Sequence, residues 1–371
     1  MAPRMAERPF TGSYREEDCV FLLKPITMAS VSVEDKERLI QSGKRHYSQM
    51  ITAEKPPSEA YMRLFDQAMD RNADRLARDL LVLARAMADA KQGPITIVSL
   101  ARAGTPVGAL LGRILRKRFS RECAHVSISI VRDRGVDHNA LAHLLSQGHR
   151  DSSLVFVDGW TGKGTIAREL TGSVQSFNER NGTRIDSGAW TIADLSGAAA
   201  VAATGEDYLI PSSILNSTVS GLVSRTILHE DHVGPTDFHG CLHYRQFEPI
   251  DRTNWFLDTI ENRAQALGLE DLPDPLRAGG VRSVALRETM GGLLAALAGR
   301  FLSATNPNFV KPGIGESTRV LLRRVPELLV LSEPDHAETS HLRMLAREKG
   351  VPVEIDPSLP VKAVALIQGM D

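Results

Sequence analysis

The sequence predicts an α/β protein, with a main domain built on a mostly parallel sheet with flanking helices and a smaller α-β-α sandwich domain after it. Short β-rich apolar runs alternate with amphipathic helical patterns between residues 94 and 195, which is typical of a parallel sheet with crossover helices. A stretch containing Pro and Gly at residues 268–280 then interrupts the pattern. The expected domains are therefore residues 1–267 and 281–371.

Length and composition fit two soluble domains. The 371 residues exceed one ordinary domain of ~100–200 residues, and 44 basic against 45 acidic residues give a net charge of −1. This balance argues against nonspecific coating of nucleic acid but leaves room for a local basic site. The three cysteines are widely spaced, which indicates reduced thiols, and we find neither a signal peptide nor an apolar run of about 18 residues. We therefore expect a cytoplasmic protein with no membrane segment.

The elements of the main domain follow in chain order. A short apolar segment at residues 19–25 precedes a helix that begins near Ser32 and a long helix from Ser58 to Ala90. Residues 207–260 are rich in hydroxyl side chains and do not continue the strand–helix repeat. The repeat consists of strands at residues 94–100, 125–131, 153–158 and 190–195 and of helices at residues 109–118, 139–146 and 166–174.

The smaller domain is predicted from a shorter set of patterns. A helix at residues 337–349 ends at Gly350, a residue type that commonly terminates helices. The other expected elements are helices at residues 284–302 and around 319–324 and strands at residues 328–331, 351–355 and 363–367.

A glycine loop after the third strand carries the strongest chemical signal. A strand, a glycine loop and a helix in succession present backbone N–H groups to a phosphate, and glycines let an anion approach the backbone. We expect Asp158, at the end of the strand, to reach ribose hydroxyls or a Mg²⁺ ion held by the phosphates. The spacing excludes the Walker A and dinucleotide motifs, and the alternative is a glycine turn that only caps a helix. The predicted phosphate-binding residues are Gly159, Thr161, Gly162, Lys163, Gly164 and Thr165.

A second glycine loop follows the first strand of the repeat. Arg102 is placed to contact pyrophosphate oxygens, which suit the fork geometry of a guanidinium. Ala103, Gly104 and Thr105 form the rest of this loop. The alternative is a tight turn with a surface arginine.

A charged segment follows the second strand. Arg132 and Arg134 are candidates to close over a phosphate as a mobile flap, and Asp137 to orient a base or a metal ion. A salt-bridged turn explains the same residues equally well.

Two patterns lie in the hydroxyl-rich region. Asn216, Ser220, Ser224 and Arg225 are candidates for an acceptor pocket, although a capped helix rich in hydroxyls is an equal alternative. A second set recurs at every other residue and would share one face of a strand, which suggests a Zn²⁺ site or a Cys/His pair. Polar packing is favoured, because such residues do not converge in a tetrahedron and no CxxC accompanies them. The set is Asp237, His239, Cys241 and His243.

The smaller domain has one candidate site, an RNA-contact loop. Its glycines would allow a close backbone approach, while its basic side chains would meet phosphates, and a plain glycine-rich helix cap is the alternative. The residues are Lys311, Gly313, Gly315, Glu316 and Arg319.

Long blocks of the sequence resemble the StiP family, phosphoribosyltransferase-like proteins associated with tellurite-resistance and stress operons. The likeness covers residues ~10–260, and the remaining residues resemble the Pelota-type RNA-binding domain. The blocks are Phe21–Pro25, His46–Met50, Ser99–Gly108, Arg132–Asp137, Val157–Thr165 and Leu215–Thr226.

This resemblance implies a phosphoribosyltransferase-like enzyme that binds phosphoribosyl diphosphate with Mg²⁺ and makes or processes a nucleoside-like metabolite. Only Asp158 stands where such enzymes usually carry two adjacent acids. The alternatives are a StiP-type cysteine protease, using Cys241 or Cys19, and a non-catalytic nucleotide- or RNA-binding sensor. The transferase hypothesis requires the turns at Gly104 and Gly162 to meet at one rim of the sheet and to face a shared ligand.

Overall fold

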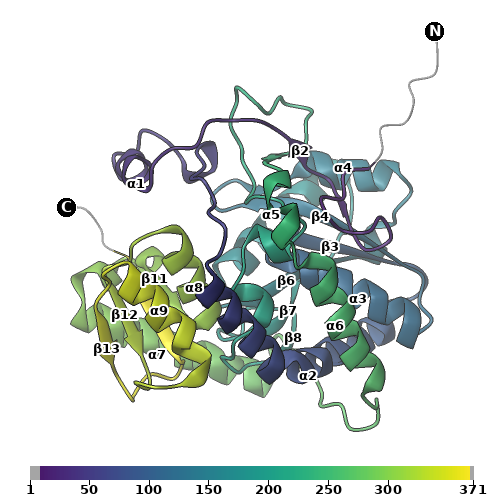
Figure 1. The fold of residues 1–371 in the computed structure, drawn as a ribbon. Helices are drawn as coiled ribbons and strands as arrows, with labels where there is room; N and C mark the ends of the chain where they lie inside the picture. Colours follow the sequence, from purple (N-terminus) through teal and green to yellow (C-terminus); the bar gives the residue numbers. More distant parts are fainter. Residues whose placement is uncertain (1–8, 368–371) are drawn as a thin grey trace.

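The computed structural model describes residues 9–367 of the chain (Figure 1). A large, mostly parallel sheet is flanked by helices, and a smaller C-terminal unit has a four-stranded sheet of its own. The predicted fold class is therefore confirmed. Within residues 9–367, none of the helices combines the length and the hydropathy that a membrane crossing requires.

The large sheet has four parallel central strands. β3 (Ile95–Ala101) lies between β4 (Cys123–Val131) and β6 (Leu154–Thr161), and β7 (Ala189–Asp194) follows β6. Their residues are mostly buried on both faces, as is usual for parallel strands covered by helices. Because the four strands run in the same direction, their carboxyl ends meet at one edge of the sheet. The remaining strands are β1 (Val20–Phe21) beside β4, β8 (Val201–Thr204) beside β7, and the antiparallel β10 (Leu276–Arg277) beside β8.

The sequence prediction missed two of these strands. β8 is only four residues long and has alanine at its two central positions, so it shows neither a period nor the run of β-branched and aromatic residues that marks most strands. β10 lies inside the stretch expected to be a linker, where Leu276 pairs with Ala202 of β8. A two-residue edge strand among prolines and glycines leaves no periodic pattern to detect.

Helices cover the large sheet in two groups. α2 (Glu59–Ala90), α3 (Gly104–Arg118) and α6 (Thr253–Ala266) pack against one another on one face. α4 (His138–Ser146) and α5 (Thr165–Asn181) pack against the other. The predicted start of α2 is confirmed, because the Ser58 hydroxyl accepts a hydrogen bond from the Tyr61 backbone N–H at 3.2 Å.

Smaller elements complete the N-terminal unit, which we define as residues 9–277. α1 (Val33–Gln41) begins after the predicted cap Ser32, β5 (Gly135–Val136) forms a hairpin with β4, and β2 (Lys24–Pro25) pairs with β9 (Gly240–Cys241). Short 3₁₀ helices lie at Tyr47–Gln49, Asp151–Ser153, Pro211–Ser213, Ser217–Val219 and Arg245–Ile250.

The C-terminal unit, residues 281–367, begins with α7 (Val281–Arg300). Its sheet has the order β11-β14-β12-β13. β11, at Val310–Pro312, occupies part of the predicted RNA-contact loop, so Lys311 lies on a strand and not in a turn. The other elements are α8 (Ile314–Arg323), β12 (Leu328–Leu331), α9 (Ser340–Glu348), β13 (Val353–Ile355), β14 (Ala363–Leu366) and 3₁₀ helices at Leu302–Thr305, Pro307–Phe309 and Ala337–Thr339.

The two units are packed tightly together. The buried carboxylate of Asp207 accepts hydrogen bonds from the backbone N–H groups of Ile314 (2.9 Å) and Lys362 (2.8 Å). A Cβ atom at Gly197 would lie 1.9 Å from the carbonyl oxygen of Ser283, so only glycine allows this approach. The contact brings α8 and β11 over the carboxyl edge of the large sheet, where the candidate site lies.

Candidate functional site

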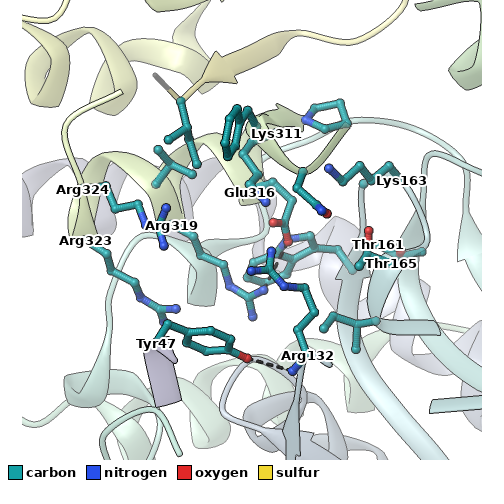
Figure 2. Close-up of a pocket in the computed structure, with 18 of the residues that line it drawn as sticks. Tyr47, Arg132, Thr161, Lys163, Thr165, Lys311, Glu316, Arg319, Arg323 and Arg324 are labelled. Carbon is teal, nitrogen blue, oxygen red and sulfur yellow. Dashed lines mark hydrogen bonds and ion pairs between the residues drawn. The ribbon is translucent and has the colours of Figure 1, made fainter. Parts of the chain in front are cut away.

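A cavity of about 290 Å³, called here the interunit cavity, lies between the two units (Figure 2). The N-terminal unit contributes the end of β6, the glycine loop and the start of α5, and the C-terminal unit contributes β11 and α8. Its charged and polar lining residues are Lys36, Tyr47, Arg132, Asp158, Thr161, Lys163, Thr165, Arg225, Asn308, Lys311, Glu316, Arg319, Arg323 and Arg324.

The glycine loop meets the C-terminal unit directly. A Cβ atom at Gly162 would lie 2.6 Å from the carbonyl oxygen of Pro312. The Lys163 ammonium donates hydrogen bonds to the carbonyl oxygens of Pro307 and Val310, the latter at 2.9 Å. This loop therefore anchors the second unit, a role that the sequence did not suggest.

The turn at Gly164 has the features of a helix cap. Gly164 has a φ of +77°, a left-handed conformation that favours glycine, and precedes α5 directly. Its N–H donates to the Thr161 hydroxyl at 3.0 Å. The predicted contacts Thr161 and Thr165 still line the interunit cavity, whereas Gly159 packs against the carbonyl oxygen of Ala103.

Asp158 is not at the end of its strand, as the sequence had suggested, because β6 continues to Thr161. It is buried and accepts a hydrogen bond from the Gly159 N–H at 2.8 Å. Burial raises its pKa to about 6, although the nearby guanidinium of Arg319 acts in the opposite direction. Within residues 9–367, no three His, Cys, Asp or Glu side chains are grouped so that they could hold a metal ion.

The two glycine turns do meet at one rim of the sheet. A Cβ atom at Gly104 would lie 2.3 Å from the carbonyl oxygen of Val157, so the loops touch through their backbones. They do not face one ligand space, because Ala103, Gly104 and Thr105 are absent from the lining of the interunit cavity. Gly104 and Thr105 begin α3.

Arg102 faces a different, neighbouring cavity of about 420 Å³. Its guanidinium donates to the Glu54 carboxylate (2.9 Å), the Asn216 side chain (2.5 Å) and the carbonyl oxygen of Val223 (3.1 Å). Glu54 thus neutralises the arginine that we expected to bind pyrophosphate. Sequence reasoning missed Glu54 because it lies 48 residues away, in a segment without periodic pattern.

The predicted acceptor residues are largely engaged with the protein itself. Ser220 donates to the Asn216 carbonyl (2.7 Å), and Ser224 donates to the Arg225 carbonyl (2.6 Å). Arg225 donates to the carbonyl oxygens of Tyr47 (2.9 Å) and Met50 and lines both cavities.

The predicted flap is a hairpin of β4 and β5. Arg132 lines the interunit cavity, whereas Arg134 lies in a separate open groove. Asp137 caps α4 by accepting hydrogen bonds from Asn139 N (3.0 Å) and Ala140 N (3.2 Å), and it also accepts one from His239 N (2.7 Å). These bonds give Asp137 a structural role in place of the expected base or metal contact.

The predicted RNA-contact loop faces the N-terminal unit. Gly313 would place a Cβ atom 2.6 Å from Leu195, and Gly315 would place one 2.4 Å from the Trp160 ring. The close approach that these glycines permit is therefore to protein side chains. Lys311, Glu316 and Arg319 line the interunit cavity, where Arg319 lies 4.8 Å from the Trp160 ring centre and 3.2 Å from Glu316.

Burial and neighbouring charges shift the pKa values of several side chains that line the interunit cavity. Burial, with Lys311 nearby, lowers the pKa of Lys163 to about 7. Burial also lowers the pKa of Arg323 well below its ordinary range, and neighbouring arginines add to the effect. Burial acts to raise the pKa of Glu316, but Arg319 and Lys311 outweigh it and leave the value lowered. Arg323 could have been found from its spacing, since it lies four residues after Arg319 on one helix face.

All three cysteines are buried, and Cys123, at 9% exposure, is the one that keeps some accessible surface. Cys19 and Cys241 are fully buried, and burial raises both thiol pKa values. Cys123 lines a surface groove of about 450 Å³ with His125, His143 and His149, and burial raises its pKa to about 11. Our predicted strand began at residue 125, so the pairing of Cys123 with His125 on one strand face was missed.

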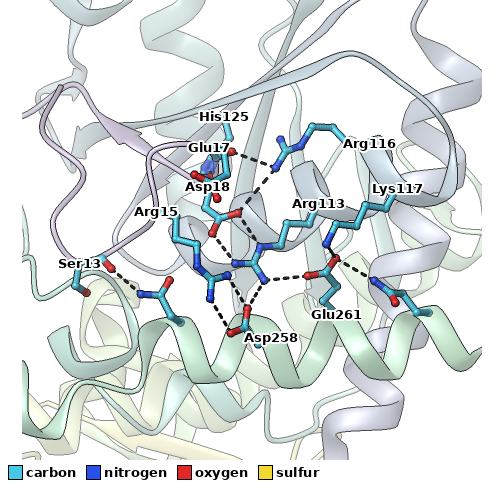
Figure 3. A network of polar contacts seen from close by, with 12 residues as sticks. Ser13, Arg15, Glu17, Asp18, Arg113, Arg116, Lys117, His125, Asp258 and Glu261 are labelled. Atoms are coloured by element: carbon cyan, nitrogen blue, oxygen red, sulfur yellow. Dashed lines mark hydrogen bonds and ion pairs between the residues drawn. The ribbon is translucent and has the colours of Figure 1, made fainter. Parts of the chain in front are cut away.

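His125 and its surroundings form a dense polar network (Figure 3). The ring bonds the Ser99 hydroxyl (2.8 Å) and the Asp18 carbonyl oxygen (2.6 Å). The Asp18 carboxylate pairs with buried Arg113 at 2.5 Å, and Arg113 also pairs with Glu261 of α6 at 3.0 Å. Within residues 9–367, no thiol is hydrogen-bonded to an imidazole.

The alternating set around Cys241 packs as polar side chains. Asp237 pairs with Lys24 at 2.6 Å, and His239 bonds the Ser129 hydroxyl at 2.8 Å. His243 packs against the ring of Phe10. This arrangement agrees with the interpretation favoured from the sequence.

Comparisons with known proteins identify both parts of the chain. Residues 12–261 match a family described as "Tellurite-like stress resistance cysteine protease StiP", and residues 295–369 match the Pelota RNA binding domain. A protein of Acinetobacter baylyi named "Cysteine protease StiP" is 37% identical over 369 residues, covering 97% of this chain and 94% of that protein. An amino transferase structure from Eubacterium rectale covers 91% of this chain and 82% of its own chain, at 11% identity and a TM-score of 0.23, too low to inform the fold.

These matches correct the function expected from the glycine loops. Phosphoribosyl transfer with a phosphoribosyl diphosphate donor is wrong, because the family and the relative are both described as cysteine proteases. The pairing of Arg102 with Glu54 and the docking of the glycine loop on Pro312 agree with this correction. The expected Mg²⁺ depended on that donor, so we propose no magnesium site. The resemblance itself is confirmed, and this chain belongs to the StiP family.

Proposed function

We propose that this protein is a cysteine peptidase of the StiP type and that Cys123 is its nucleophile. The observation that carries the assignment of the nucleophile is the position of Cys123 in a surface groove beside three histidines. Cys19 and Cys241, the two cysteines that the sequence offered for the alternative of a cysteine protease, are fully buried, so a peptide bond cannot reach either thiol in this conformation.

The chemistry requires a thiolate at Cys123. The thiol loses its proton, the sulfur attacks the peptide carbonyl, the amine leaves with a proton, and water hydrolyses the resulting thioester. His143 and His149 are the candidate proton carriers, because both ring nitrogens of His125 are already hydrogen-bonded. Burial is the main cause of the raised pKa of Cys123 and Arg116 opposes it, so hydration of the groove would favour the thiolate.

Cleavage of fluorescently labelled casein by the full chain tests this proposal. Cys123→Ser is expected to reduce the rate on the order of 10³-fold, as loss of a nucleophile usually does. Cys241→Ala is the matched control, because it removes a buried thiol outside the groove and should retain the rate when the protein is folded. Full activity of Cys123→Ser, or no cleavage by the unmodified chain, would reject the assignment.

We also propose that the C-terminal unit binds RNA, because residues 295–369 match an RNA-binding domain. The predicted contacts Lys311 and Arg319 face the interunit cavity, so a long RNA would have to use other basic residues of this unit. Fluorescence anisotropy with labelled single-stranded RNA at increasing salt tests the idea. Affinity should fall steeply with salt if phosphates are contacted, and the absence of saturable binding at low salt would contradict it.

A further inference from the structure

The interunit cavity gathers much more positive than negative charge. Eight lysine and arginine side chains line it, against two carboxylates, Asp158 and Glu316. Glu316 is already hydrogen-bonded to Arg319 at 3.2 Å. Like charges in an enclosed space repel one another, so a bound anion would stabilise this arrangement.

Arg323 is a cation of this cavity for which the protein provides little compensation. It lines both the interunit cavity and the neighbouring cavity around Glu54. No residue within the described range 9–367 accepts a hydrogen bond from its guanidinium. The charges acting on it include Arg102, Arg319 and Arg225, whereas Glu54 is held by Arg102 at 2.9 Å. A guanidinium with five donors and no acceptor lacks the partners that buried charges normally have.

The other arginines of the cavity are held in place. Arg319 stacks on Trp160, with 4.8 Å between the guanidinium carbon and the ring centre. Arg225 donates to two backbone carbonyl groups, one of them at 2.9 Å. Figure 2 shows the side chain of Arg132, which follows β4, and those of Arg319 and Arg323, both on α8, entering the same space. Guanidinium groups fixed in this way suit bidentate contacts to phosphate oxygens.

The cavity also has apolar lining residues, which limits the kind of anion that fits. The cavity is close to the lower end of ordinary ligand pockets, ~300–1,000 Å³, so it suits a small molecule and not a folded RNA. Apolar side chains would cover a flat, uncharged part of the ligand while the arginines hold its charges. The apolar lining includes Ile40, Ile166, Phe309 and Ile367.

We propose that the interunit cavity binds a small molecule that carries two or more linked phosphates and an apolar, nucleoside-like part. Arg132, Arg319 and Arg323 contact the phosphates, and apolar lining side chains such as Phe309 contact the apolar part. The ligand is bound and not converted, so this site is independent of the proposed peptidase groove at Cys123. Because both units line the cavity, the bound ligand strengthens their contact.

Isothermal titration of the full chain without divalent cations tests the site, with ATP, inorganic tripolyphosphate and adenosine as probes. ATP is expected to bind saturably, tripolyphosphate about tenfold more weakly, and adenosine more weakly still. Equal binding of ATP and tripolyphosphate would contradict the nucleoside-like part of the ligand and identify an inorganic polyphosphate in its place. No saturable binding of either phosphate compound would overturn the proposal. Displacement of bound ATP by single-stranded RNA that lacks a terminal phosphate would overturn it in favour of RNA.

The Arg323→Gln variant separates a ligand contact from a structural role. We expect it to raise the Kd for ATP at least about tenfold, because a charge-assisted contact is lost. The melting temperature of the unliganded variant should be unchanged or higher, because a partly buried cation without an acceptor has been removed. Arg71→Gln, on the exposed side of α2, is the matched control and should change neither quantity. An unchanged Kd, or a lower melting temperature of unliganded Arg323→Gln, would contradict the proposal.

Discussion

Replacing Gly162 by alanine tests whether the glycine loop docks the C-terminal unit. The added Cβ atom would lie 2.6 Å from the Pro312 carbonyl oxygen and 3.1 Å from Cγ of Glu316. Pro312 belongs to β11, which is paired with β14, so its carbonyl cannot turn away as a flexible side chain would. Forcing a methyl group into such a contact typically costs ~1–3 kcal/mol. The variant should therefore unfold at lower urea concentration than the unmodified protein.

Gly172→Ala is the matched control for this experiment. Gly172 lies on α5, and a Cβ atom there would meet no atom within 4 Å. Alanine inside a helix is favoured over glycine by up to ~1 kcal/mol, so this variant should be more stable. The two substitutions are thus expected to have opposite signs. If Gly162→Ala and Gly172→Ala shift the urea midpoint in the same direction, the docking role of the loop is refuted.

Three further predictions concern the buried polar groups. Arg113→Met should lower the free energy of unfolding by about 3–5 kcal/mol in urea titrations, because the buried Asp18 carboxylate loses its partner, and a loss below ~1 kcal/mol would contradict this. Acid should destabilise the fold, because burial lowers the pKa of His125 to about 4. The stabilisation of the fold by neutral His125 is complete above about pH 6.5, the ordinary pKa of histidine, and on the order of 3 kcal/mol is lost as the pH falls toward 4. The free energy of unfolding measured across this range should therefore depend less on pH in His125→Asn. Iodoacetamide should modify Cys123 before Cys241. The rate of modification of Cys123 should rise about tenfold per pH unit from about pH 7 to 10, because burial raises the pKa of its thiol to about 11. A rate that does not depend on pH would exclude a simple titration of this thiol.

The fold was predictable where local patterns were strong. The strand–helix repeat from β3 to α5 gave the direction of the central strands, and the caps Ser32 and Ser58 gave the starts of α1 and α2. β8 and β10 were not predicted, because two to four residues are too few to show the alternation of a strand. β11 escaped because Pro312 and Gly313 resemble a turn, and only its pairing with β14 makes it a strand.

The candidate site was only partly predictable, because its chemistry depends on contacts between distant segments. The sequence singled out Thr161, Lys163 and Lys311 as phosphate or RNA contacts, and all three line the interunit cavity. It could not reveal that Glu54 neutralises Arg102 or that the second unit closes over the glycine loop. Both effects arise from tertiary packing, which leaves no signal in residue spacing.

The hydrogen bonds that Asp207 accepts from the C-terminal unit have a consequence for folding during synthesis. Its two hydrogen-bond donors, Ile314 and Lys362, lie more than a hundred residues further along. At ribosomal rates of roughly 5–20 residues per second, roughly 8–30 s pass after synthesis of Asp207 before both donors are present. During that interval the Asp207 carboxylate and the unfinished rim of the sheet remain exposed to water and to chaperones. Completion of the nascent N-terminal half is therefore postponed until translation is almost finished.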